Sequence, residues 1–344
     1  MTILVQTATP NSSNRVNGHV MEGDIAIEDP ELAASLRPIY TKFLSDLNLP
    51  PLERFESEKL MTAVLEAAAA TGVPHPLNSR SYEGLLVGYS YADNCLPYLP
   101  LDVKVWVAIY TWLATLCDEP DRAGILEDMS LFQERWVKGL PQPTVLLGAF
   151  ADQIRLTYEY WHPLVANMIV TASFGFVTAT ALGARDDIKG KTANPSKGGQ
   201  LFPWFMRSRD GVGEAYAWFP FPKTMFPNLD VPIEAIEDMN RFLAFTNDVL
   251  SFYKEQLNGE KDNYTNKIAG YSQKSLVETL KEASEDVIAC VRRIEHVLAG
   301  NEEYAKAWYL HKTGYIHMHT MRSRYKLWQL DIGEKPGEKE TLRE

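Results

Sequence analysis

The chain has 344 residues, of which 45% are hydrophobic, 11% aromatic and 23% charged, so it has enough apolar surface for a sizeable core. This composition excludes a chain that is disordered throughout and a collagen-like repeat. Its 34 Lys plus Arg against 45 Asp plus Glu give a formal net charge of -11, which opposes nucleic-acid binding. An anionic ligand would need a local basic site or bridging metal ions.

The two ends of the chain show no sustained hydrophobic period. We expect a mobile arm over residues 1–36, one domain over residues 37–332 and a polar tail over residues 333–344. Residues 1–17 carry a single charged side chain, Arg15, and lack the ~7 to 15 apolar residues of a secretory signal. The three cysteines are odd in number and widely spaced, which indicates a reducing compartment. We therefore expect a cytoplasmic protein.

Between the ends, apolar residues recur at the spacing of an α-helix, and strand alternation with hairpin turns is nearly absent. Proline and glycine gather between these segments, and no repeat or low-complexity linker divides them. The pattern predicts a single all-α bundle of about ten or more helices. The predicted helical segments are 38–48, 56–72, 101–117, 125–138, 144–184, 231–258, 274–298 and 302–328.

The stretch at 163–184 carries no charged side chain and approaches the ~20 residues of a membrane span. Asn167, Ser173 and several threonines are interleaved with small residues along it. This composition favours a helix buried inside the bundle over one that faces lipid, so we expect no membrane partner.

The most specific motif is Asn-Asp-Val-Leu-Ser-Phe-Tyr-Lys-Glu at residues 247–255. On a helix, Asn247, Ser251 and Glu255 advance by only ~40° per step of four, so an amide oxygen, a hydroxyl and a carboxylate share one face. Mg²⁺ takes such oxygen ligands when water and substrate phosphate complete its octahedron. A solvated polar stripe is the simpler alternative, but the flanks are strongly apolar, and we favour a metal site.

A second acidic cluster, Asp-Glu-Pro-Asp at residues 118–121, follows the apolar helix predicted at 101–117. Because the helix dipole disfavours carboxylates at a C-terminus, Asp118 and its neighbours call for a compensating cation. An exposed turn around Pro120 is the alternative. Taken alone, this cluster leaves both interpretations open.

Together the two clusters resemble the metal motifs of class I terpene cyclases, and the match is closest to the trichodiene synthase family of sesquiterpene cyclases. Residues 247–255 fit that family's second motif, Asn-Asp-x-x-Ser-x-x-Lys-Glu, without a mismatch. The stretch from Gly314 to the pair Arg324-Tyr325 resembles the family's terminal helix. The segment around Arg207 resembles the one that holds a diphosphate-sensing arginine, with Arg209 as a competing position. The resemblance covers about residues 37 to 330.

The resemblance implies a helical bundle of the class I terpene synthase type with a central active-site cavity. It also implies a lyase of secondary metabolism that ionises farnesyl diphosphate with three Mg²⁺ ions and releases diphosphate. The carbocation would cyclise to a sesquiterpene hydrocarbon or alcohol, and a homodimer is compatible with the match. The implied metal ligands are Asp118, Asn247, Ser251 and Glu255. The implied diphosphate donors are Arg207, Lys254, Arg324 and Tyr325. The implied catalytic residues are Asp118, Arg207, Arg324 and Tyr325.

The first motif departs from the family pattern, because Glu119 and Asp121 stand where an aspartate-rich run is usual. These two residues are left open as ligands. The cavity should be apolar and aromatic so that it shields a carbocation from water. We expect only a minority of the candidate aromatic residues to line it. These candidates are Trp106, Tyr110, Phe174, Phe176, Trp218, Phe245, Trp308 and Tyr315.

Three other functions are alternatives to a cyclase. A chain-elongating prenyl diphosphate synthase would call for two aspartate-rich motifs, and the Asn/Ser/Glu pattern speaks against it. A helical scaffold would not explain oxygen ligands on apolar helices. A zinc hydrolase is disfavoured because His317 and His319 lie ~200° apart on a helix and cannot share one ion. We expect these two histidines to be satisfied polar side chains near a solvated end.

Overall fold

The structure, a computed structural model, describes residues 27–50 and 57–333. Within these ranges the chain is helical and has no strand, which confirms the predicted all-α fold. In chain order the α-helices are α1 (Pro30–Leu47), α2 (Glu58–Ala70), α3 (Arg80–Cys95), α4 (Leu101–Cys117), α5 (Pro120–Ala123), α6 (Leu126–Met129), α7 (Phe132–Val137), α8 (Val145–Arg155), α9 (Thr157–Tyr160), α10 (Pro163–Gly183), α11 (Asp186–Ala193), α12 (Phe202–Asp210), α13 (Gly213–Trp218), α14 (Ile236–Leu257), α15 (Tyr264–Ser272), α16 (Leu276–Leu298) and α17 (Glu302–Thr320). Three 3₁₀ helices are η1 (Ile233–Ala235), η2 (Ser323–Tyr325) and η3 (Leu327–Leu330).

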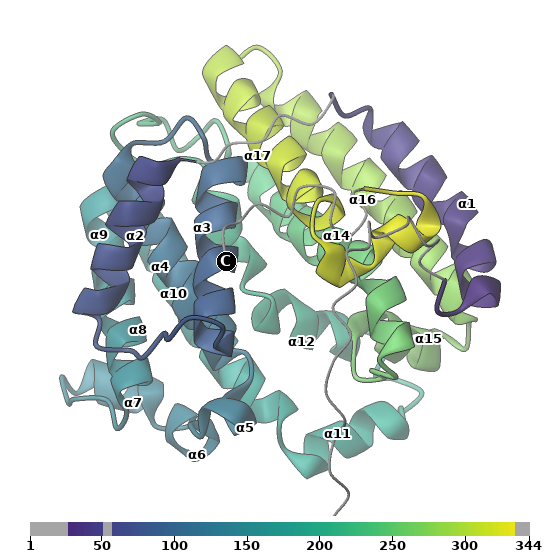
Figure 1. Ribbon diagram of the computed structural model, residues 1–344, viewed down its shortest axis with the longest axis horizontal. Coiled ribbons are helices and arrows are strands. Elements are labelled where there is room, and N and C mark those ends of the chain that lie inside the picture. The colour runs from purple at the N-terminus through teal and green to yellow at the C-terminus, as the bar shows by residue number, and fades with distance from the viewer. Residues whose placement is uncertain (1–26, 51–56, 334–344) are drawn as a thin grey trace, which may run out of the picture.

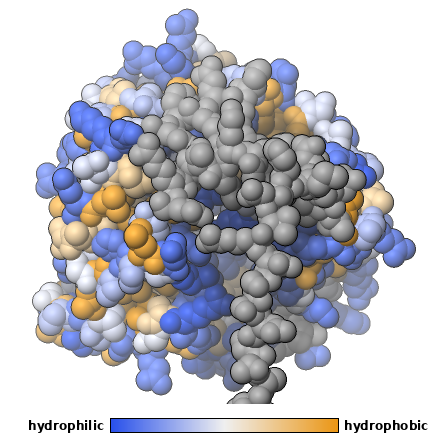
Figure 2. Space-filling model, in the orientation of Figure 1, coloured by the Kyte–Doolittle hydropathy of each residue, from blue (hydrophilic) through white to orange (hydrophobic). Residues whose placement is uncertain are grey.

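The helices form two groups that face each other across the middle of the molecule (Figure 1). One group includes α2, α3, α4, α8 and α10, and the other includes α1, α14, α16 and α17. The two groups are joined where α17 packs against α3, while α14 packs against α16. One continuous cluster of buried hydrophobic residues extends through both groups. On the face shown in Figure 2, hydrophobic residues are scattered among hydrophilic ones.

Several helices lie where the sequence predicts them. The bounds of α4 (Leu101–Cys117) coincide with the predicted segment, and α14 and α16 lie inside theirs. A capping box between Ser275 and Glu278 fixes the start of α16. Two long predictions are divided. The segment 125–138 becomes α6 and α7, and the segment 144–184 becomes α8, α9 and α10, with Pro163 at the first turn of α10.

The predicted arm over residues 1–36 is too long, because α1 begins at Pro30 rather than near residue 38. Asp29 caps this helix by accepting a hydrogen bond from the Leu32 amide, and Pro30 suits the first helical position. Pro38 lies inside the helix and is not its start. The rest of the predicted arm, before residue 27, and the tail after Gly333 lie outside the described residues.

Helix α3 packs closely on α4 and α17 at two glycines, one on α3 and one on α17. A β-carbon at Gly88 of α3 would lie 2.2 Å from the Ala108 carbonyl oxygen of α4. A β-carbon at Gly314 of α17 would lie 2.0 Å from the Asn94 carbonyl oxygen of α3. Both contacts are between main chains, which cannot move aside as a flexible side chain can. They fix the spacing of α3, α4 and α17.

The uncharged helix α10 is long and apolar enough to span a membrane, and half of its most apolar stretch is buried in the protein. It packs against α12 and α13, and Ser173 on it accepts or donates a 2.7 Å hydrogen bond with the Tyr110 hydroxyl of α4. This position within the bundle agrees with the predicted buried helix.

Candidate active site

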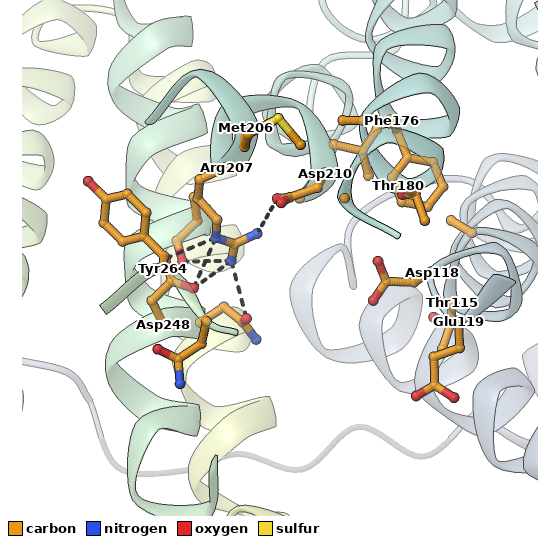
Figure 3. Close-up of a pocket in the computed structure, with 18 of the residues that line it drawn as sticks. Thr115, Asp118, Glu119, Phe176, Thr180, Met206, Arg207, Asp210, Asp248 and Tyr264 are labelled. Carbon is orange, nitrogen blue, oxygen red and sulfur yellow. Dashed lines mark hydrogen bonds and ion pairs between the residues drawn. The ribbon is translucent and has the colours of Figure 1, made fainter. Parts of the chain in front are cut away.

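A cavity of about 840 Å³ lies between the two groups of helices. Residues of α3, α4, α10, α12, α14, α15 and α17 line it. Charged residues gather at one end, where α4 stops at Asp118 and the pairs Arg207–Asp248 and Arg207–Asp210 lie (Figure 3). We call this end the mouth, and the part of the cavity wall that includes Tyr91 and Tyr216 the floor.

The second motif lies on α14, whose apolar residues are buried around it. Asn247, Asp248 and Glu255 line the cavity. Ser251, one turn after Asn247, is buried, and its hydroxyl has no hydrogen-bond partner. The Asn247 amide nitrogen lies 3.1 Å from His319 Nε2. A buried hydroxyl without a partner costs stability, so Ser251 suits a ligand that the protein alone does not supply.

Arg207 on α12 points across the cavity mouth to α14 (Figure 3). Its Nε donates to both carboxylate oxygens of Asp248 at 2.9 Å, and its Nη2 donates to Asn247 Oδ1 at 3.3 Å. Burial opposes the guanidinium charge, but the carboxylates of Asp248 and Asp210 raise the pKa of Arg207 above its ordinary value. A β-carbon at Gly211 would lie 2.3 Å from Arg207 Nη1, so this glycine leaves room for the guanidinium.

The competing arginine, Arg209, contacts a residue of its own helix, α12. The guanidinium of Arg209 lies 4.0 Å from the centre of the Phe205 ring and donates to the Phe205 carbonyl oxygen at 2.8 Å. Arg207 lines the cavity and Arg209 does not. Of the two arginines that the sequence left open, Arg207 therefore has the geometry for an anion at the mouth.

The carboxylate of Asp118 follows the last turn of α4 and opens into the cavity opposite Arg207 (Figure 3). Partial loss of water around Asp118 and the nearby Asp210 carboxylate raise its pKa to about 6, although the side chain is exposed at the mouth. Burial likewise raises the pKa of Asp248 to about 6, although Arg207 lowers it. A bound cation would stabilise the charged form of these two carboxylates.

The other acids of the first motif have different surroundings. Glu119 forms ion pairs with Arg80 and Arg122, and in Figure 3 it points away from Arg207. Asp121, in the short helix α5, is exposed, and both acids also line the cavity. Glu119 already has cationic partners, so Asp118 is the acid of this motif that is best placed for a metal.

The predicted diphosphate donors are placed unequally. Tyr325 in η2 is buried and lines the cavity, whereas Arg324 is exposed, with its guanidinium 5.3 Å from the centre of the Tyr325 ring. Lys254 Nζ lies 3.7 Å from Glu255 Oε1. Arg324, Lys254 and Ser251 are not among the lining residues, so their roles stay predictions.

The oxygen donors fit magnesium better than zinc. In the part of the chain that the structure describes, no three His, Cys, Asp or Glu residues are grouped closely enough to hold a metal ion. Asn and Ser oxygens beside Glu255 form a hard donor set, and the unpartnered Ser251 hydroxyl is available. His319 corrects one expectation, because it is buried rather than near a solvated end, and its Nδ1 lies 2.8 Å from the Tyr315 carbonyl oxygen.

Only a minority of the candidate aromatic residues line the cavity, as expected. Phe176 and Tyr315 do, while Trp106, Trp218 and the others belong to the packed core or its edge. Sequence reasoning missed further lining residues, which are Tyr91, Tyr216, Tyr264 and Lys267. Tyr91 lies on α3, Tyr216 on α13 and the other two on α15, and none of these helices carries a recognised motif, so no local pattern marks them.

Comparisons with known proteins agree with this geometry. A sequence model described as trichodiene synthase matches residues 79–343. Longiborneol synthase CLM1 of Gibberella zeae is 57% identical over 316 residues, which cover 92% of this chain and 93% of the relative. Terpene synthase BipA of Cochliobolus sativus is 36% identical over 295 residues, which cover 85% of this chain and 89% of the relative.

The fold is shared with a more distant solved structure. Linalool/nerolidol synthase from Streptomyces clavuligerus superposes with a TM-score of 0.56 at 13% identity, covering 78% of this chain and 98% of that one. The same enzyme in complex with 2-fluorogeranyl diphosphate gives a TM-score of 0.55 at 13% identity, covering 79% of this chain and 97% of that one.

Proposed function

The chain belongs to the trichodiene synthase family and is a sesquiterpene cyclase, and we propose that its substrate is farnesyl diphosphate, which it ionises with Mg²⁺. The observation that carries the proposal is the division of the cavity. Its mouth has oxygen-bearing side chains on two facing walls, with Arg207 paired to the α14 wall, and its floor is aromatic. A charged head at the mouth and a hydrocarbon tail on the floor suit a prenyl diphosphate.

Asp118 on one wall and Asn247, Ser251 and Glu255 on the other are the residues that would hold magnesium. Three ions are expected from the family resemblance. Bound magnesium supplies positive charge that makes the diphosphate a better leaving group. The support in this chain is the partnerless Ser251 hydroxyl and the raised pKa of Asp118.

The chain's own donors would hold the leaving diphosphate. Arg207 would exchange Asp248 for phosphate oxygens, and Tyr325 would donate its phenol from η2. Arg324 and Lys254 would join them as the mouth closes, because both lie beside lining residues. The apolar walls would exclude water from the carbocation until the product forms.

Two further features belong to the same proposal. We place the enzyme in the cytoplasm, supported by the thiols of Cys95, Cys117 and Cys290, which are all buried and not in disulfides. A homodimer is the proposed assembly, to be measured by sedimentation of the full chain. The enzyme's proposed product is a sesquiterpene hydrocarbon or alcohol.

Incubation of the purified protein with Mg²⁺ and geranyl, farnesyl or geranylgeranyl diphosphate tests the substrate. We expect fifteen-carbon products from farnesyl diphosphate as the main outcome in mass analysis of the extract, with equimolar diphosphate release. Adding isopentenyl diphosphate separates the alternative, because a chain-elongating synthase would then form longer diphosphates.

The metal assignment has its own test. Glu255→Ala, Ser251→Ala and Asn247→Ala should each remove most turnover while the fold survives, because each removes an oxygen ligand. Circular dichroism checks the fold. Undiminished turnover by Glu255→Ala at low Mg²⁺ would overturn the assignment of the second motif.

A further inference from the structure

The floor of the cavity contains a buried polar pair that the metal and diphosphate chemistry does not use. Tyr91 of α3 is 2% exposed and His311 of α17 is fully buried. The Tyr91 hydroxyl lies 2.6 Å from His311 Nε2, and the two residues are 220 positions apart in the chain. His311 Nδ1 has no hydrogen-bond partner. A hydrophobic pair would fill the same place without burying an unpaired nitrogen, so packing alone does not explain this one.

The pair lies further along α3 than the residue that reaches Glu119 of the first motif. Arg80, the first residue of α3, pairs with Glu119 at the mouth, and Tyr91 follows it by eleven residues on the same helix. At 1.5 Å per residue this separates the two by about 16 Å along the helix axis. Tyr91 therefore lies where the hydrocarbon tail of a substrate held at the mouth would reach.

The pair is uncharged. Burial lowers the pKa of His311 to about 3, so its imidazole is neutral at physiological pH. Burial also raises the pKa of Tyr91 well above its ordinary value, so its phenol keeps its proton. Between neutral partners, the phenol is the more acidic donor and the imidazole nitrogen the stronger acceptor. The Tyr91 hydroxyl therefore donates to His311.

This hydrogen bond sets the orientation of the Tyr91 side chain at the cavity wall. Tyr91 lines the cavity and His311 does not, so the hydroxyl is directed into the wall and the ring is left toward the substrate. The ring is also held edge-on by Tyr216 at 4.9 Å and by Tyr315 at 6.2 Å between ring centres. A phenol that donates a hydrogen bond has more electron density in its ring, which strengthens the attraction of the ring for a cation.

We propose that Tyr91 is a specificity-determining residue that stabilises a carbocation at the cavity floor, and that His311 is its positioning residue. The inference rests on the proposed farnesyl diphosphate cyclase. No proton leaves the pair. His311 acts by orienting the Tyr91 ring and enriching it in electrons. The carbocation that forms nearest to the floor is stabilised most. The bonds that form next, and hence the product, depend on that gain.

The primary test compares Tyr91→Phe and His311→Leu with the wild type, with farnesyl diphosphate and Mg²⁺. Diphosphate release by the wild type is measured first, so that failure of the proposed function is seen separately. We expect either variant to lower kcat by about tenfold and to raise the share of early-quenched products. KM should change less than twofold, since the mouth is untouched. Tyr98→Phe is the matched control, because that hydroxyl donates to the Pro220 carbonyl outside the cavity.

The double variant tests whether His311 acts through Tyr91. If it does, His311→Leu should add almost nothing in the Tyr91→Phe background, in kcat and in product pattern. His311→Gln, which keeps an acceptor, should recover part of the wild-type pattern and serves if His311→Leu does not fold. A wild-type product pattern from Tyr91→Phe, or fully additive effects in the double variant, would overturn the proposal.

Discussion

At the scale of single residues, the first motif separates two adjacent carboxylates by their partners. Asp118 opens into the cavity near Asp210, and its pKa is raised by enclosure and by that acid. Glu119 is neutralised by Arg80 and Arg122 at the rim. Asp118 is therefore available to a cation in the cavity, whereas the charge of Glu119 is already balanced by arginines.

We predict unequal losses when these acids are neutralised. Asp118→Asn should lower kcat/KM with farnesyl diphosphate by roughly 100-fold, because it removes charge that faces the diphosphate site. Glu119→Gln and Asp121→Asn should cost less than about fivefold, as expected for a partly exposed ion pair or an exposed acid. Steady-state kinetics at saturating Mg²⁺ decides, and equal losses at all three positions would contradict the assignment.

The buried His311 also makes a prediction about stability. Its pKa is about 3 in the folded protein and near 6.5 when unfolded, so below pH 6.5 the unfolded chain binds the extra proton. The contribution of His311 to stability is present above pH 6.5 and is lost as the pH falls. Relative to His311→Gln, the wild type should lose up to about 1.4 kcal/mol per pH unit between pH 6.5 and 5.

Urea unfolding of both proteins at pH 7, 6 and 5 measures this difference. Because all other titrating groups are shared, their contributions cancel in the comparison. Parallel pH profiles for the wild type and His311→Gln would mean that His311 takes up its proton in the folded protein as readily as in the unfolded chain.

At the scale of helices, the main-chain contacts of α3 set the frame of the site. We predict that Gly314→Ala destabilises the protein by at least about 2 kcal/mol, because the new β-carbon meets the Asn94 carbonyl oxygen at 2.0 Å. Gly148→Ala in α8 is the control. Nothing lies within 4 Å of a β-carbon there, so it should be neutral or stabilise by about 0.5–1 kcal/mol. Equal denaturation midpoints for the two variants would refute the contact.

The helices that the sequence predicts well and badly differ in what they bury. Helix α4 buries apolar residues in a long run, so its period is visible. Helix α3 was missed because its buried face includes Gly84, Gly88, Ser90 and Asp93, which read as polar or as breakers. Asp93 is acceptable there because Lys104 of α4 pairs with it at 2.6 Å and the Ser57 amide donates to it at 2.9 Å.

The same limit holds for the site. The second motif could be found because its ligands share nine consecutive positions on one helix. Tyr91 and His311 are joined by a hydrogen bond across 220 positions, and only the packing of α3 against α17 brings them together. A single sequence holds no local sign of such a pair.

At the scale of the whole molecule, charge at the mouth should couple ligand binding to closure. In the free protein Arg207 donates hydrogen bonds to Asp248 and Asn247, and Arg324 lies exposed beside Tyr325. Diphosphate with metal would offer all of these groups a common partner and draw α12, α14 and η2 together.

We therefore predict that Mg²⁺ and inorganic diphosphate together raise the melting temperature by roughly 5 °C or more, and that either alone does much less. Glu255→Ala should lose most of this shift. Hydrogen exchange should slow in residues 118–124 and 190–211. If calorimetry shows binding and neither segment gains protection, the pocket is rigid and closure is refuted.

The backbone contacts at Gly88 and Gly314 bear on how new products could arise in evolution. Because main chain rather than side chains sets the spacing of α3, α4 and α17, a substitution on the cavity floor changes the shape of the floor without moving the helices. The mouth, which performs the ionisation, is then insulated from changes at the floor. Descendants of such an enzyme can explore different ring skeletons one side chain at a time while the first chemical step stays intact.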